Sequence, residues 1–144
     1  MDYTKINEYL VSIFNRVQTI EATSLKSSQF YDVSLKEMHT IDIIGKQKNV
    51  TPSDIASELM LTLGTVTTSL NRLETKGYIQ RNRSNVDRRV VHLVLTKKGK
   101  LLYRLHSEFH KSMVKKIIEE MNEEEMEALL KGLISLHQFL EELL

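Results

Sequence analysis

Two pairs of side chains have the types and spacing that chemistry requires, and each favours a different function. Asp87 and Arg89 lie two residues apart in a polar stretch, where the carboxylate can accept a charge-assisted hydrogen bond that fixes the guanidinium. A fixed guanidinium suits the narrow minor groove of A/T-rich DNA. His106 and His110 lie four residues apart, so on a helix both rings share one face, at a spacing that can hold zinc. The first pair predicts a DNA contact, and the second leaves a metal site as the alternative.

What the sequence lacks argues against catalysis. The 144 residues include no cysteine, which excludes disulfides, thiolate zinc sites and thiol redox sensing. No glycine-rich phosphate loop and no recognisable Ser/His/Asp arrangement occurs. The stretch His106-Ser107-Glu108-Phe109-His110 also differs from the H-E-x-x-H pattern of zinc proteases. We therefore expect a protein that is not an enzyme and carries no resident cofactor.

Charge is distributed unevenly along a chain whose formal net charge is only +1. Residues 72–116 contain thirteen Lys/Arg against three Asp/Glu, whereas residues 117–144 contain one against eight. A local excess of cations attracts phosphates, so the middle segment predicts nucleic-acid binding. A solvated helix face could carry the same charges. The acidic C-terminal segment is expected to point away from the phosphates.

Composition and hydropathy are those of a globular protein in water. Hydrophobic residues make up 41% of the chain and charged residues 27%. No apolar run approaches the roughly 18 residues that a membrane span needs. The polar residues 1–7 do not resemble a signal peptide. We therefore expect a cytoplasmic protein without membrane contact.

The N-terminal half of the chain predicts three helices. Apolar residues recur every three or four positions over residues 3–20, as on an amphipathic helix. Ser34 and Glu37 form a capping-box pattern that opens a second helix, and Gly45 is expected to end or loosen it. Thr51-Pro52-Ser53-Asp54 is a strong start for a third, short helix, because threonine caps, proline occupies the first turn and aspartate meets the positive helix end.

Further caps predict the remaining helices. Thr62 is expected to cap a fourth helix, which Gly77 ends in the left-handed conformation. Thr96 is expected to cap a long fifth helix, and Asn122 with Glu125 forms a second capping-box pattern before a last one.

Between Gly77 and Thr96 the pattern changes from helical to alternating. Residues 78–81 and 90–95 are rich in β-branched and apolar residues, and the polar residues 82–89 separate them. This pattern predicts a β-hairpin with a long charged tip. A helix-turn-helix followed by a hairpin is the winged helix arrangement.

The fold class expected is therefore mostly α with a small β-hairpin wing. We predict one domain over residues 1–144, with the winged helix-turn-helix in residues 34–96. Residues 1–30 and 100–144 are predicted to be dimerisation helices, because apolar helix faces of this length must be buried. Packing of these helices only on each other is the alternative. A homodimer would place two copies of the winged helix-turn-helix on a palindromic DNA site.

The helix from Thr62 to Lys76 is predicted to read DNA. Its apolar stripe should face inward, and a recognition helix places its N-terminal half in the major groove. The small threonines can meet thymine methyl groups, which predicts an A/T-rich operator. The outward residues are Leu63, Gly64, Thr65, Thr67, Thr68, Asn71 and Arg72. In the wing we expect Asp87 to orient Arg89, and we expect phosphate contacts from Arg81, Arg83, Arg88, Lys97 and Lys98.

The sequence resembles the MarR family of bacterial transcription regulators. The resemblance rests on Ala56-Ser57-Glu58-Leu59, on Leu73-Glu74-Thr75-Lys76-Gly77-Tyr78-Ile79, and on Asp87-Arg88-Arg89 followed by Leu93-Val94-Leu95-Thr96-Lys97-Lys98-Gly99. It implies a winged-helix homodimer that binds double-stranded DNA and regulates transcription. Met60 departs from the pattern, because the family often has a small turn residue there.

Within this family the likeness is greatest to repressors of type II fatty-acid synthesis in Gram-positive cocci. It is carried by residues 35–42, 63–70 and 87–93. The resemblance implies repression of fatty-acid synthesis genes with a long-chain acyl-acyl carrier protein as corepressor. The residues then expected to line an effector pocket are Phe14, Val17, His39, Ile41, Leu105, Phe109 and Met113. The alternative is a zinc-responsive repressor of this family that uses His39, His106 and His110, although such sites add a cysteine that this chain lacks.

Overall fold

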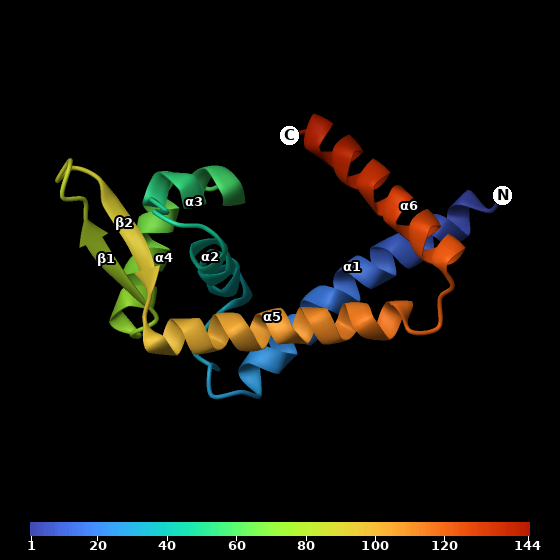
Figure 1. Ribbon diagram of the computed structural model, residues 1–144, viewed down its shortest axis with the longest axis horizontal. Helices are drawn as coiled ribbons and strands as arrows, with labels where there is room; N and C mark the ends of the chain where they lie inside the picture. Colours follow the sequence, from blue (N-terminus) through green and yellow to red (C-terminus); the bar gives the residue numbers. More distant parts are fainter. The chain divides into compact units, whose positions relative to one another are not determined.

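The computed structural model describes all residues, 1–144, as two compact units. Residues 1–104 form the first unit and residues 105–144 the second, and the division falls within one helix. The chain confirms the predicted fold class, because it consists of helices and one β-hairpin (Figure 1). The elements are α1 (Tyr3–Lys26), α2 (Leu35–Lys46), α3 (Pro52–Leu59), α4 (Leu63–Thr75), β1 (Ile79–Arg83), β2 (Val91–Leu95), α5 (Lys97–Ile118) and α6 (Glu123–Glu142).

Three of the predicted helix starts form as expected. Thr51 accepts a hydrogen bond from the Asp54 amide at 3.2 Å while the Asp54 carboxylate accepts one from the Thr51 amide at 2.9 Å. Asn122 and Glu125 form the same reciprocal box at α6. Thr62 accepts from the Thr65 amide at 3.2 Å. Each cap supplies an acceptor to an amide that the first helical turn leaves unpaired, which stabilises a helix by about 1 kcal/mol.

One local prediction for α2 is wrong. Ser34 accepts from the Glu37 amide at 3.2 Å, but the Glu37 carboxylate does not return to Ser34. It binds Lys76, because a buried carboxylate gains more from a cation than from an amide. The helix ends at Lys46, one residue beyond the predicted Gly45. The Tyr103 ring takes up the space there, since a Cβ on Gly45 would lie only 2.5 Å from Tyr103 Cδ2.

Residues with positive φ mark two turns, one inside the helix-turn-helix and one between α4 and the hairpin. Met60 ends α3 with φ 53°, so the small turn residue that the family often has is replaced here by a residue held in the conformation glycine favours. Gly77 follows α4 with φ 84°, as predicted. The turn at Gly77 lets the Tyr78 amide donate to the Leu73 carbonyl at 2.9 Å and starts the hairpin directly after α4.

The hairpin pairs β1 with β2 in antiparallel register, from Ile79 opposite Leu95 to Arg83 opposite Val91. The strands begin and end within two residues of the predicted runs. The Leu93 amide also donates to the Val50 carbonyl at 2.7 Å, which ties β2 to the segment before α3. The base of the wing is therefore fixed to the helical body, while its tip extends beyond the paired residues.

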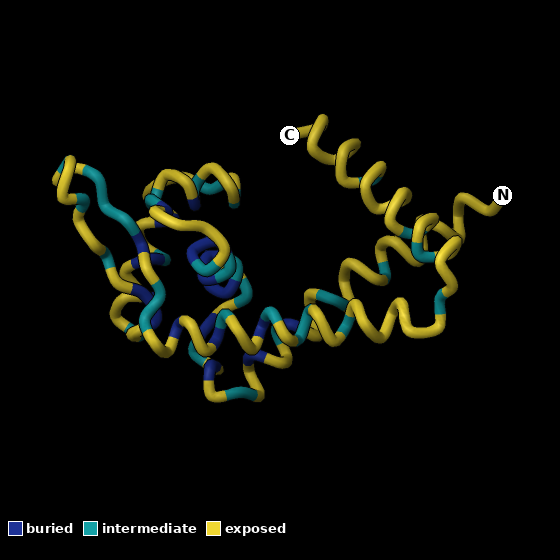
Figure 2. The backbone as a smooth tube through the Cα atoms, viewed as in Figure 1, coloured by how far each residue is buried: buried dark blue, intermediate teal, exposed yellow.

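The hydrophobic core lies within the first unit. It runs from Leu25 to Leu102 and includes the fully buried Met38, Ile41 and Ile55. The inner face of α4 completes it with Val66, Leu70 and Leu73. Figure 2 shows the buried positions gathered in α2, α4 and the base of the hairpin, whereas α6 has no buried residue. The assignment of both chain ends to dimerisation helices stays a prediction. No helix combines the length and the apolar character needed to cross a membrane.

Candidate nucleic-acid interface

Helix α4 presents the predicted reading residues on its solvent side. Its buried stripe of Val66, Leu70 and Leu73 fixes the rotation of the helix on the core. The side opposite this stripe is exposed along the whole helix. It carries Leu63, Gly64, Thr65, Thr67, Thr68, Asn71 and Arg72, all of which the structure places in solvent.

The threonine hydroxyls near the start of α4 already have partners. Thr65 Oγ1 lies 2.8 Å from Thr62 Oγ1, and Thr68 Oγ1 donates to the Gly64 carbonyl at 3.1 Å. Because Thr68 has used its proton, it can offer only acceptor lone pairs and a methyl group to a ligand. The first turns of α4 therefore present a small, partly apolar surface, which suits contact with the methyl group of thymine.

The wing contains the predicted bond between Asp87 and Arg89. Arg89 Nε donates to Asp87 Oδ1 at 3.2 Å and a terminal guanidinium nitrogen donates to Oδ2 at 3.3 Å. The Arg89 amide donates to the same carboxylate at 3.0 Å. These amide and guanidinium donors hold the pKa of Asp87 below its ordinary value of 3.8, so the carboxylate is ionised at neutral pH. The Arg89 side chain is 91% exposed, so its remaining donors face solvent.

The other basic residues of the predicted set differ in whether their side chains make hydrogen bonds within the protein. Arg83 and Arg88 are exposed on the wing, where Arg83 donates weakly to the Arg88 carbonyl at 3.4 Å. Lys97 is exposed at the start of α5. These three side chains are available to phosphates.

Arg81 and Lys98 are engaged within the fold, which sequence reasoning did not foresee. Arg81 donates to Glu74 at 3.0 Å and to Asn71 at 2.9 Å. Lys98 Nζ lies 4.3 Å from the centroid of the Tyr78 ring and donates to the Lys76 carbonyl at 3.2 Å. Their predicted phosphate contacts remain predictions, but both side chains also brace the junction between α4, the wing and α5.

A partly buried polar network at the C-terminal end of α4 was not predicted from the sequence. Lys76 Nζ, at the C-terminal end of α4, donates to the Asp32 carbonyl and lies 3.0 Å from Glu37 Oε2. The Tyr78 hydroxyl donates to Asp32 at 2.6 Å. Burial and this hydrogen bond raise the pKa of Tyr78 far above its ordinary value of 10.0, so the hydroxyl stays a neutral donor. The partners are up to 46 residues apart, and no local pattern joins them.

The histidines and the predicted effector residues are divided between the units. His106 and His110 lie on α5 with their Nε2 atoms 3.0 Å apart, whereas His39 belongs to α2 in the first unit. Ile41 is fully buried in the core of the first unit. Phe14, Val17 and His39 belong to the first unit as well, and Leu105, Phe109 and Met113 belong to the second. Neither unit contains a complete set, so both sites stay predictions.

The fold and the exposed residues together define a winged helix-turn-helix protein with a solvent-facing recognition helix and a basic wing. The MarR family model matches residues 33–91. Over 111 residues the chain is 32% identical to the HTH-type transcriptional regulator YfiV of Bacillus subtilis (strain 168), covering 76% of this chain and 69% of that protein. The chain belongs to the MarR family, and it is a DNA-binding transcriptional regulator rather than an enzyme.

Solved structures extend the comparison over the whole chain. The crystal structure of Streptococcus pneumoniae FabT in complex with DNA superposes with a TM-score of 0.95 and 64% identity, covering 99% of this chain and 100% of that one. The Staphylococcus aureus MepR–DNA complex has a TM-score of 0.73 and 23% identity, covering 96% of each chain, and supports the fold alone.

Proposed function

We propose that this protein is a repressor of fatty-acid synthesis genes that binds a palindromic, A/T-rich operator as a homodimer. The observation that carries the proposal is the 64% identity to Streptococcus pneumoniae FabT, which was crystallised with DNA. The resemblance of residues 35–42, 63–70 and 87–93 to repressors of fatty-acid synthesis supplies the class of target gene.

The proposed mode of binding follows from the two exposed elements. Helix α4 enters the major groove with Leu63, Gly64, Thr65, Thr67, Thr68, Asn71 and Arg72, while Arg89, oriented by Asp87, enters the adjacent minor groove. Phosphates are contacted by Arg83, Arg88 and Lys97, and by Arg81 and Lys98 if they leave their internal partners. In a homodimer the two winged helix-turn-helix units lie about one turn of the DNA helix, roughly 34 Å, apart.

The proposed corepressor is a long-chain acyl-acyl carrier protein. A ligand that binds the DNA-competent dimer better than the free form shifts the population toward that dimer, and a tenfold gain in DNA affinity requires about 1.4 kcal/mol of differential binding. Burial of about two methylene groups supplies that much free energy. The expected lining residues are Phe14, Val17, His39, Ile41, Leu105, Phe109 and Met113.

Zinc is the second candidate effector because His106 and His110 bring two imidazole nitrogens within 3.0 Å of each other. Two ligands are fewer than the three or four that zinc sites use, so a zinc site would also need His39 or another donor. No step of the DNA-binding mode depends on the metal.

Selection of bound sites from random DNA tests the operator, and operator titration tests the effector. The titration compares long-chain acyl carrier protein, unacylated carrier, and zinc with a chelator control. We expect an A/T-rich palindrome and a gain in affinity only with the acylated carrier. A gain with zinc, reversed by the chelator, would instead identify a metal sensor.

A further inference from the structure

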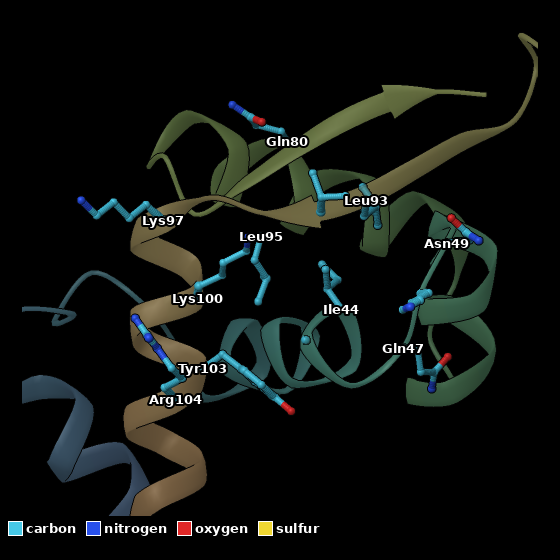
Figure 3. Close-up of a pocket in the computed structure, with 13 residues that line it drawn as sticks. Ile44, Gln47, Asn49, Gln80, Leu93, Leu95, Lys97, Lys100, Tyr103 and Arg104 are labelled. Carbon is cyan, nitrogen blue, oxygen red and sulfur yellow. The ribbon is translucent and has the colours of Figure 1, made fainter. Parts of the chain in front are cut away.

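A groove of about 940 Å³ lies in the first unit where α2, the hairpin and α5 meet (Figure 3). Its volume is within the range of small-molecule sites, about 300–1,000 Å³. None of the predicted effector residues lines it, and only Lys97 belongs to the proposed DNA-contacting set. The lining consists of Ile44, Gly45, Gln47, Lys48, Asn49, Gln80, Leu93, Val94, Leu95, Lys97, Lys100, Tyr103 and Arg104.

The floor of the groove is apolar and firmly supported. Ile44 and Leu93 are 5% and 2% exposed and belong to the core, and Leu95 and Tyr103 pack against that core. The Tyr103 ring is held against Gly45, where a Cβ would lie 2.5 Å from its Cδ2 atom. In Figure 3 the side chains of Ile44 and Leu95 extend into the space between α2 and β2, and the Tyr103 side chain runs from α5 along α2. An apolar ligand segment would therefore meet a surface that is already formed.

The rim of the groove is cationic. Lys48, Lys97, Lys100 and Arg104 line it and are exposed, and the lining includes no aspartate or glutamate. In Figure 3 the Lys100 side chain extends across the space toward Leu95, whereas Lys97 points away from it. A negative group held above the floor would thus find Lys100 nearest, with Arg104 on the same helix one turn further on.

We propose that this groove binds a single-chain anionic amphiphile, with its apolar chain on the floor and its carboxylate or phosphate head at Lys100, inside the cationic rim to which Arg104 also belongs. A DNA backbone carries phosphates but offers no apolar chain to cover Ile44, Leu93 and Leu95, so a small molecule matches the lining better. The proposal does not rest on the acyl carrier protein as corepressor, because it concerns a free ligand and a different set of residues.

Calorimetric titration of the full-length protein tests the chemistry of the ligand. The probes are decanoate, decyl phosphate, the uncharged decanol and the shorter octanoate. We expect the two anions to bind and decanol to bind at least about tenfold more weakly, and the stronger of the two anions identifies the head group. Each buried methylene should raise affinity about fourfold, so decanoate should exceed octanoate. Equal binding of decanol and decanoate, or binding of neither anion, would overturn the proposal.

Charge-reversal variants test the location. Lys100→Glu and Arg104→Glu should each weaken decanoate binding about fivefold and leave operator affinity without ligand within about twofold. Lys36→Glu, the same charge change at an exposed α2 position outside the groove, should leave both unchanged. Circular dichroism verifies that each variant is folded. Unchanged decanoate binding in both groove variants would contradict the site, and loss of operator affinity without ligand would assign these cations to DNA phosphates.

Discussion

Helices α4 and α6 are both amphipathic, yet they bury their apolar sides to different degrees. In α4, Val66, Leu70 and Leu73 are at most 1% exposed because the core of the first unit receives them. In α6, Leu130, Leu133 and Ile134 remain 48–58% exposed, and the helix has no buried residue. The core that supports α4 is therefore complete within one chain, whereas the apolar side of α6 is left exposed and marks an interaction site.

Helix α1 shares this property with α6. Tyr3, Ile6, Ile13 and Phe14 are 57–77% exposed on a helix of 24 residues. Apolar patches of this extent are uncommon on a monomer in water and mark an interaction site. A second copy of the chain provides two such surfaces at once, so the contrast between body and terminal helices supports the proposed homodimer.

The largest expected effect on operator affinity comes from disrupting the proposed homodimer. Replacing Leu133 and Ile134 together with glutamate should give a monomer, because two charges cannot be buried unpaired in an apolar interface. Operator affinity should fall by at least about a hundredfold, since each winged helix-turn-helix then binds alone. Sedimentation and gel-shift titration measure the two effects. Lys131→Glu, a charge change at a polar position of α6, is the control, and a double variant that remains dimeric would contradict the assignment.

The wing provides the second largest effect, and it should leave the dimer intact. Arg89→Ala removes an exposed guanidinium that packs on no core residue, so stability should not change. Operator affinity should fall by about 1–3 kcal/mol, and binding to random DNA should change much less. Val86→Ala is the matched control, because Val86 is 98% exposed at the same tip. Normal operator binding by Arg89→Ala would disprove the role of the wing.

The third prediction concerns the ion pair between Lys76, which follows the recognition helix α4, and Glu37 of α2. Lys76→Met leaves the Glu37 carboxylate, 8% exposed, without its cation, and should lower the free energy of unfolding by about 2 kcal/mol. Lys36→Met, at an exposed position of α2, should cost much less. Denaturant unfolding measures both. Equal stability of the two variants would show that the network at the C-terminal end of α4 is not needed to fix it.

Local signals in the sequence predicted most of the fold. Thr51, Thr62 and Asn122 cap helices as their types and spacing indicate, and Gly77 adopts the positive φ that ends α4. The wing pair followed from a separation of two residues between Asp87 and Arg89. In each case the interacting groups lie within a few residues of one another, where spacing alone determines reach.

The features that were not predicted from the sequence all involve residues far apart along the chain. The Glu37 carboxylate binds Lys76, 39 residues away, instead of completing the predicted capping box, and Tyr103 packs against Gly45, 58 residues before it in the chain. The groove at Ile44 joins four segments whose approach no local pattern encodes. Tertiary contacts of this kind override local propensity. The sequence therefore predicted the exposed DNA-binding residues of α4 and the wing better than the contacts that fix these elements on the core.

The smallest effect should come from Lys98, which lies where the body meets the start of α5. Its contacts with the Tyr78 ring and the Lys76 carbonyl should contribute no more than about 1 kcal/mol, because the side chain is exposed. If Lys98 also contacts a phosphate, Lys98→Ala should weaken operator and random DNA alike and reduce the salt slope of binding by about one. Lys36→Ala should leave that slope unchanged. A lower melting temperature with an unaltered slope would assign Lys98 to the body of the fold alone.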